Sequence, residues 1–378
     1  MAYGFGGAEQ TTANLLNHLD RDRIKQITLV APAALRPYLP ATYNRFVDSA
    51  LCWLEPGFAT PGVLRRDAKA FGDLLHILAP DVALGMMHYA SALVVSGVRL
   101  TGLRTRTIAS YRGPLYEYLR HYEPDPRRRR FLQTVAAETA SLADRVIVPS
   151  QGVADELQQR FLTPSQKIAV ILNGIDLAHV TEAARTATPE LAHLDQDKTP
   201  VLCAIARLAP EKNLGLLLEA FRRIHATCPA MLLMIGDGPE RETLKAQVTA
   251  WGLTDSVQFV GYLANIYPYL RRADVFIHTC HLEGFGYTML EALACGTAVV
   301  ATDCPYGPRE VLDYGKCGLL VPMDNPDALA GATLRLLADP ALRQTLVVHG
   351  LGRAKQLSVR RMAEAYTTEL VALGSVTS

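Results

Sequence analysis

Residues 281–307 read HLEGFGYTMLEALACGTAVVATDCPYG, and this stretch decides the fold of the chain. A Gly-Phe-Gly turn at 284–286 is followed by a helical run over Tyr287–Cys295. Apolar segments at Val275–Thr279 and Ala298–Ala301 flank these two elements and predict buried strands. Strand, glycine turn, helix and strand in that order are typical of a parallel sheet whose turns approach a ligand.

Two glutamates bracket the glycine turn. Glu283 precedes the turn, and Glu291 follows eight positions later. Eight residues of helix leave the second only ~80° away from the first around the axis, so the two share nearly one face. A helix N-terminus between two hydrogen-bond acceptors suits a ligand with hydroxyl groups on both sides of its phosphates. The segment therefore predicts a sugar-nucleotide site, with ribose at one glutamate and hexose at the other.

This segment resembles the E-x7-E signature of retaining glycosyltransferases of family 4. The resemblance implies an α/β protein with the GT-B fold: two Rossmann-like domains face a central cleft, and the C-terminal helix crosses back to the N-terminal domain. In that family the first glutamate contacts the donor sugar and the second contacts the ribose, which implies these roles for Glu283 and Glu291. A bare pair of glutamates would instead indicate two carboxylates on a helix surface, but the flanking strands disfavour that interpretation.

Two cations follow the predicted strand Val201–Ala206. Arg207 and Lys212 flank a short turn at the carboxyl edge of the sheet, where open α/β sheets bind ligands. They could neutralise a diphosphate, both in the ground state and as charge builds on the leaving group. The family resemblance implies the same role, whereas the pair alone would also fit a solvated loop with an ion pair to Glu211.

The candidate site residues fall into two groups. The catalytic candidates are Glu283, Arg207, Lys212 and His88. The donor-binding candidates are Glu291, Gly284, Phe285, Gly286, Tyr287, Thr288, Gly6, Gly7, Gly236 and Tyr262. Gly236 also fits a purely structural turn, and Tyr262 fits either stacking on the base or packing at the rim.

The first half departs from the family pattern in two ways. Gly6 and Gly7 belong to a GGAE-like loop that should follow the first strand, yet only residues 1–3 precede Gly4, so we expect this sheet to lack its first strand. Many family members carry a histidine near the donor sugar, but the corresponding stretch 109–114 contains none. His88 is a substitute, or else a residue of the cleft wall. We therefore assign no general base.

Composition sets broad limits on the class of protein. With 378 residues, 49% hydrophobic and 20% charged, the chain is predicted to form two or three globular domains. Its seven cysteines show no C-x-x-C pair, which favours a reducing cytoplasm over a disulfide framework. It opens with no secretory leader and contains no apolar run of ~18 residues. Nothing accompanies the arginines that would indicate nucleic-acid binding.

Charge is unevenly shared between the halves. Residues 1–178 carry a net charge of +4 and residues 179–378 a net charge of −3. The basic half contains the run Arg127–Arg130, which fits peripheral contact with an anionic membrane. It fits a solvated helix start at least as well. The D-x-D patterns at Asp20–Asp22 and Asp195–Asp197 are interpreted as unrelated to a metal, and we expect neither a metal nor another cofactor.

The domain boundaries follow the apolar pattern. We predict an N-terminal acceptor-binding domain at 1–178, a linker at 179–199, a nucleotide-sugar-binding domain at 200–355 and a returning C-terminal helix at 356–378. Strands are predicted at Gln26–Ala31, Val82–Gly85, Thr105–Ser110, Arg145–Pro149, Ile168–Leu172, Val201–Ala206, Met231–Ile235, Val257–Val260, Val275–Thr279, Ala298–Ala301 and Leu319–Val321.

These features lead to one functional hypothesis and two alternatives. The hypothesis is retaining transfer of a hexose or N-acetylhexosamine from a nucleoside diphosphate sugar to a glycan or lipid-linked saccharide, in the cytoplasm at the inner membrane face. A UDP-sugar is the favoured donor and a GDP-sugar the second choice. The alternatives are a non-catalytic sugar-nucleotide-binding protein and a GT-B sugar-nucleotide epimerase.

Overall fold

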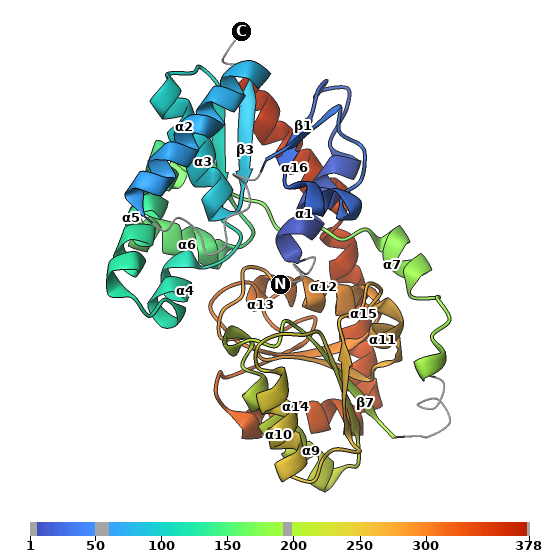
Figure 1. Ribbon diagram of the computed structural model, residues 1–378. Coiled ribbons are helices and arrows are strands. Elements are labelled where there is room, and N and C mark those ends of the chain that lie inside the picture. The colour runs from blue at the N-terminus through green and yellow to red at the C-terminus, as the bar shows by residue number, and fades with distance from the viewer. Residues whose placement is uncertain (1–5, 50–59, 192–198, 376–378) are drawn as a thin grey trace. The chain divides into compact units, whose positions relative to one another are not determined.

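The computed structural model describes residues 6–49, 60–191 and 199–375, and it divides the chain into two compact units (Figure 1). Unit 1 comprises Met1–Gly174 and Val359–Ser378, and unit 2 comprises Ile175–Ser358. Unit 2 thus begins three residues before the predicted domain end at 178. It also includes the described part of the predicted linker 179–199.

Unit 2 is built on a six-stranded parallel sheet with the order β12-β11-β10-β7-β8-β9. Relative to chain order, its strands run 6-5-4-1-2-3, which is the doubly wound Rossmann order. The order reverses between β7 and β10, where Leu202 pairs with Val275 and Cys203 with Phe276. The strands are β7 Val201–Ile205, β8 Met231–Ile235, β9 Val257–Gly261, β10 Val275–His278, β11 Ala298–Thr302 and β12 Leu319–Val321.

Helices cover both faces of this sheet. Successive residues of a strand point to opposite faces, and along the central strands nearly all of them are buried. Leu202 and Ala204 join one core with α9, α10 and α14, while Cys203 between them is equally buried on the opposite face. Continuous burial on both faces explains why these strands read as unbroken apolar runs. The helices are α7 Leu177–Ala183, α9 Leu214–Thr227, α10 Arg241–Ala250, α11 Tyr267–Arg272, α12 Tyr287–Ala294, α13 Pro308–Val311, α14 Pro326–Ala338 and α15 Pro340–Gln356, with 3-10 turns at η4 Pro189–Leu191 and η5 Pro210–Lys212.

Unit 1 contains a four-stranded parallel sheet of order β3-β4-β5-β6 and a separate parallel pair, β1-β2. The strands are β1 Thr28–Ala31, β2 Arg45–Asp48, β3 Val82–Met86, β4 Arg106–Ser110, β5 Arg145–Val148 and β6 Ile168–Val170. The helices are α1 Gly7–His18, α2 Pro61–Leu78, α3 Met87–Thr101, α4 Leu115–Tyr122, α5 Pro126–Leu142 and α6 Gln151–Arg160, with 3-10 turns at η1 Ala33–Tyr38 and η3 Ser165–Lys167.

The final helix, α16 Val359–Gly374, belongs to unit 1 and packs on the four-stranded sheet. Its Met362 and Tyr366 share a core with Ile108 of β4 and Leu15 of α1. The predicted return of the C-terminal helix to the N-terminal domain is therefore confirmed.

Arg112, in the stretch where the family histidine was expected, links α16 to α1 and to the loop after β6. Its guanidinium donates to the Tyr366 hydroxyl at 3.0 Å and to the Thr11 hydroxyl at 2.9 Å, and it also contacts the Asn173 carboxamide. One side chain after β4 thus ties α1, α16 and the loop after β6 together within unit 1.

Several sequence-based expectations can be compared with these elements. All eleven predicted strands occur, with boundaries shifted by up to two residues, whereas β2 was not predicted. The run Arg127–Arg130 forms the first turns of α5, where Asp125 accepts from the Arg127 amide. Residues 1–5, including the stretch before Gly6, and Asp195–Asp197 lie outside the described residues.

Candidate active site

The candidate site lies at the carboxyl edge of the unit 2 sheet, where β7 and β10 are neighbours. In a doubly wound sheet the loops after these two strands diverge to opposite sides and leave a crevice between them. The loop after β7 carries Arg207 and Lys212, and the loop after β10 carries Glu283. The fold thus brings these three predicted residues to one edge.

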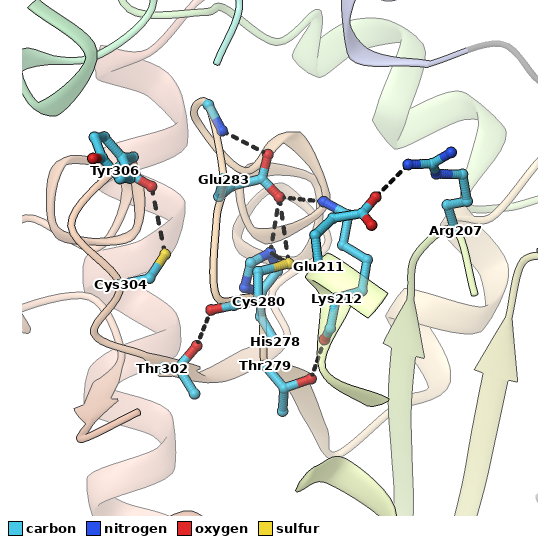
Figure 2. Close-up of polar contacts among 11 residues, drawn as sticks. Arg207, Glu211, Lys212, His278, Thr279, Cys280, Glu283, Thr302, Cys304 and Tyr306 are labelled. Atoms are coloured by element: carbon cyan, nitrogen blue, oxygen red, sulfur yellow. Dashed lines mark hydrogen bonds and ion pairs between the residues drawn. The ribbon is translucent and has the colours of Figure 1, made fainter. Parts of the chain in front are cut away.

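Glu283 is the centre of a cluster of polar side chains (Figure 2). Its Oε2 accepts from Lys212 Nζ at 2.8 Å and lies 3.3 Å from His278 Nε2. The Cys280 thiol lies 3.5 Å from the same oxygen and 3.3 Å from His278 Nε2. The other oxygen, Oε1, accepts the Gly284 amide at 3.0 Å. The Glu283 carboxylate therefore contacts groups from the loops after β7 and β10 and from the end of β10 itself.

Each ionisable group in this cluster stabilises the charged form of its neighbours. Burial would raise the pKa of Glu283, but Lys212 and His278 beside it hold its pKa well below the usual range. Burial would likewise lower the pKa of Lys212 and of His278, yet Cys280 and Glu283 outweigh it, raising the pKa of Lys212 and bringing that of His278 to about 9. At neutral pH the carboxylate is therefore ionised between two cations.

Arg207 and Lys212 are held by different partners. Arg207 is paired with Glu211, and its side chain remains 59% exposed, whereas that of Lys212 is 20% exposed. The short turn η5 carries Lys212, whose carbonyl oxygen accepts from the Thr279 hydroxyl at 2.9 Å. The loops after β7 and β10 are thus bonded to each other, which fixes the Lys212 ammonium opposite Glu283.

The glycine turn leads directly into α12. Gly286 is the N-cap of that helix and has φ of 97°, in the left-handed region that favours glycine. Gly307, with φ of 91°, packs so tightly on the Phe285 carbonyl that a Cβ atom would overlap it. The backbone at Gly307 therefore packs directly against the turn that contains Gly284 and Phe285. Tyr287 and Thr288 begin the helix, and its N-terminal end carries the positive pole of the helix dipole.

Glu291 has a separate set of partners. Its Oε1 accepts from the Tyr267 hydroxyl of α11 at 3.4 Å. Burial raises the pKa of Glu291 to about 7, and the hydrogen bond from Tyr267 opposes this shift. The ring of Tyr267 also makes an edge contact with His179 of α7, with centroids 5.8 Å apart. The second glutamate thus has partners of its own, which are not those of the Glu283 cluster.

Gly236 and Tyr262 directly follow the next two strands, β8 and β9, along the same edge. Gly236 has φ of 129°, and its amide donates to the Gly261 carbonyl at 2.8 Å. A Cβ atom here would overlap the Ala206 carbonyl oxygen, so the glycine allows the backbones after β7 and β8 to meet. Tyr262 is 58% exposed, which leaves its ring open to a ligand.

The candidates from the first half lie in unit 1. Gly6 is the N-cap of α1, and its amide donates to Glu9 Oε2 at 3.0 Å, while Gly7 begins the helix. His88 lies in the first turn of α3, directly after β3, and burial lowers its pKa to about 4. A histidine with that pKa is neutral at pH 7 but a weak base.

Two family models together match most of the chain. Residues 191–350 match the model described as glycosyl transferases group 1, and residues 5–179 match that of glycosyltransferase family 4. The lipopolysaccharide core biosynthesis glycosyltransferase LpsE of Rhizobium meliloti is 30% identical over 351 residues, which is 91% of this chain and 89% of that enzyme. The chain belongs to the family 4 glycosyltransferases. It is therefore an enzyme of transferase class, and the two alternative functions are set aside.

Other similar proteins extend the comparison of this family 4 glycosyltransferase. An N-acetylgalactosaminyltransferase of Campylobacter jejuni that acts on a diphospho-undecaprenol-linked sugar is 29% identical over 221 residues, or 58% of each chain. The crystal structure of Anabaena Alr3699/HepE in complex with UDP superposes with a TM-score of 0.77 at 21% identity, covering 98% of this chain and 97% of that one. This structural likeness confirms the GT-B fold.

Sequence reasoning on this glycosyltransferase missed three side chains of the site. His278 lies at the end of β10, inside the predicted strand Val275–Thr279, and Cys280 lies just after it, but neither was among the predicted site residues. Tyr267, the partner of Glu291, was not singled out. A signal was available for the first two, because polar side chains at the carboxyl end of a central parallel strand commonly face a ligand.

Proposed function

We propose that this protein transfers a hexose or an N-acetylhexosamine from a nucleoside diphosphate sugar, with retention of the anomeric configuration. The favoured donor is a UDP-sugar, with a GDP-sugar as second choice, and the acceptor is a glycan or a lipid-linked saccharide. The observation that supports this most is the pairing of Lys212 with Glu283 at the switch point of a Rossmann sheet, beside the exposed Arg207.

The roles of these residues follow from their chemistry. Arg207 and Lys212 would neutralise the diphosphate, and Glu283 would accept hydrogen bonds from sugar hydroxyls, which strengthen as positive charge develops on the sugar ring. The bond from the anomeric carbon to the phosphate oxygen breaks, and a bond from that carbon to the acceptor oxygen forms on the same face. The departing phosphate oxygen takes the acceptor proton, so neither His88 nor another general base is required.

Ligand-binding and product experiments test this proposal. The protein is incubated with UDP-, GDP- and ADP-sugars, and its melting temperature is measured, because a ligand that binds only the folded state raises stability by mass action. The stabilising donor is then supplied with lipid-linked saccharide acceptors, and proton NMR of the product reports the anomeric configuration. An inverted product would refute the retaining mechanism.

Replacing Arg207 or Lys212 by Ala should weaken binding of the free nucleoside diphosphate by about 10-fold or more, since one charge-assisted hydrogen bond contributes ~1.5–3 kcal/mol. Arg207→Ala is the cleaner variant, because its side chain is mostly exposed, whereas Lys212→Ala also leaves Glu283 with His278 as its remaining cationic partner. Calorimetry gives both constants. Binding to Arg207→Ala as tight as binding to Arg222→Ala, a control change on α9 where the guanidinium lies over the Trp251 ring, would contradict the role of Arg207.

We also propose that no metal assists the transfer. Arg207 and Lys212 supply positive charge where a metal would otherwise be needed, and neither Asp20 nor Asp22 belongs to a cluster of three metal-ligating side chains in the described ranges. Turnover should therefore be undiminished after dialysis against EDTA. An absolute requirement for added Mg²⁺ or Mn²⁺ in the same assay would revive the D-x-D patterns as ligands.

The proposed place of action is the cytoplasmic face of the membrane. Within the described residues, no helix is both long enough and apolar enough to cross a bilayer. Arg127 and Arg130 are exposed at the start of α5 and could contact anionic lipid headgroups, each contributing ~1 kcal/mol. Replacing both by Gln should reduce co-sedimentation with phosphatidylglycerol vesicles about 10-fold or more, and binding equal to that of the unmodified protein would exclude this contact.

A further inference from the structure

Three potential metal ligands gather at one point of the site, and the proposed transfer uses only one of them. His278 Nε2, Cys280 Sγ and a Glu283 carboxylate oxygen all lie within 4.8 Å of one another (Figure 2). In the described part of the chain this is the one such group of three. His278 is 5% exposed and Cys280 2% exposed, so two of the ligands are buried.

The separations of these atoms match a tetrahedral zinc site. Zinc binds sulfur at ~2.3 Å and nitrogen or oxygen at ~2.0–2.1 Å, so tetrahedral angles place sulfur about 3.5 Å from a nitrogen or oxygen and place nitrogen about 3.3 Å from oxygen. The observed separations are 3.3 Å for Cys280 to His278, 3.5 Å for Cys280 to Glu283 and 3.3 Å for His278 to Glu283. The triangle therefore has the dimensions of one face of a zinc tetrahedron.

The three ligands are held in place by the fold. His278 is the last residue of β10, and the Cys280 carbonyl accepts from the Thr302 hydroxyl of β11 at 2.9 Å. The Gly284 amide fixes the other carboxylate oxygen. A metal ion could reach the three ligands from the side of Glu283 and the neighbouring Lys212, because these side chains are 18% and 20% exposed.

Two features distinguish this group from the site of a resident metal. Resident metal-binding histidines donate their second ring nitrogen to a partner, but His278 Nδ1 is buried with no such partner in the described residues. In addition, Lys212 Nζ donates to the Glu283 carboxylate at 2.8 Å, and a metal cation would have to displace this ammonium group. The chemistry therefore fits a metal that enters and leaves, with water as the fourth ligand.

We propose that His278, Cys280 and Glu283 form a reversible inhibitory site for a soft divalent cation, with Zn²⁺ as the type case. On binding, the ion displaces one proton from the His278 imidazolium and one from the Cys280 thiol to solvent, takes the Glu283 carboxylate and releases it from Lys212. The inhibitory consequence rests on the proposed function, because it requires Glu283 to hold the donor sugar, whereas the binding itself does not.

Binding is tested on the full chain with Co²⁺ and Zn²⁺. Co²⁺ bound tetrahedrally through a thiolate gives an intense near-ultraviolet charge-transfer band and visible bands, and Zn²⁺ should abolish both. Competition with a chromophoric chelator then gives the Zn²⁺ affinity. Cys280→Ser should lower it at least about 10-fold, because it removes the thiolate ligand. Cys317→Ser is the matched control. Cys317 is also buried, but its thiol donates to the His349 carbonyl at 3.6 Å and does not belong to the group of three ligands.

Activity is tested with and without Zn²⁺ for each variant. The unmodified enzyme and Cys317→Ser should lose most of their turnover in Zn²⁺ and regain it in EDTA, while Cys280→Ser should keep its own metal-free rate. Absence of the cobalt–thiolate band, or equal Zn²⁺ affinity in Cys280→Ser, would overturn the site. Binding at Cys280 with no change in turnover would overturn inhibition. Binding without transfer from any donor would instead refute the proposed function and leave the metal site standing.

Discussion

Replacing Glu283 by Gln is expected to lower turnover by about 10- to 200-fold, because it removes one charged hydrogen bond of ~1.5–3 kcal/mol from the transition state. The amide keeps the shape of the side chain but not its charge. Binding of the free nucleoside diphosphate should change little, because this product lacks the sugar that Glu283 is proposed to hold. Steady-state kinetics and calorimetry measure the two effects separately.

A matched control for Glu283 lies at the other end of the same strand. Asp274 directly precedes β10, and its carboxylate lies 3.2 Å from Arg343 and accepts the Val201 amide at 3.0 Å. Asp274→Asn should therefore cost stability but not catalysis. If Glu283→Gln and Asp274→Asn reduced turnover equally, the effect would be one of folding, and the assignment of Glu283 to the sugar would be wrong.

The structure changes what should be expected for stability at Glu283. A carboxylate on a surface loop usually contributes little to folding. Instead, Glu283 neutralises Lys212 and His278 in a largely buried cluster. Removing its charge should also cost about 1–3 kcal/mol of the free energy of unfolding, because the buried His278 and the partly buried Lys212 lose their counterion. Kinetics must therefore be measured well below the melting temperature of the variant.

Replacing Gly236 by Ala is expected to lower the melting temperature of unit 2 by about 6–12 °C and to weaken nucleotide binding. Its φ of 129° is open almost only to glycine, and the new Cβ would overlap the Ala206 carbonyl oxygen. Backbone cannot move aside as a flexible side chain can, so a cost of about 3 kcal/mol or more follows. Ala206 precedes Arg207, which makes the displacement reach the diphosphate-binding candidate.

Gly215 provides the control for this substitution. It lies in the first turn of α9, and a Cβ atom there would meet no other atom within 4 Å. Gly215→Ala should raise the melting temperature slightly, since it removes backbone freedom from the unfolded chain. Calorimetric unfolding of both variants checks the pair. A Gly236→Ala protein as stable as Gly215→Ala would show that the backbones after β7 and β8, at Ala206 and Gly236, do not meet as closely as described.

The sequence by itself determined the local elements and the family. The strand Met231–Ile235 was predicted to the residue, because a strand buried on both faces must be a continuous apolar run. The edge strand Leu319–Val321 was also predicted to the residue, since its three residues are all apolar. The glycine turn at 284–286 and the two glutamates were equally visible, since each depends on residues close together in the chain. β2 was missed because Arg45–Asp48 has only two apolar residues, between an exposed Arg45 and an exposed Asp48, and so carries no apolar run.

Only the tertiary structure decided which distant residues meet. Lys212 and Glu283 are 71 positions apart, and they form an ion pair because β7 and β10 become neighbours where the strand order reverses. The same fold turned His278 and Cys280 toward Glu283 and placed Tyr267 beside Glu291. Local patterns state that a segment is a strand, but its neighbours in the sheet are chosen by the packing of the whole unit, so the order of strands and the contacts at their ends exist only once the chain has folded.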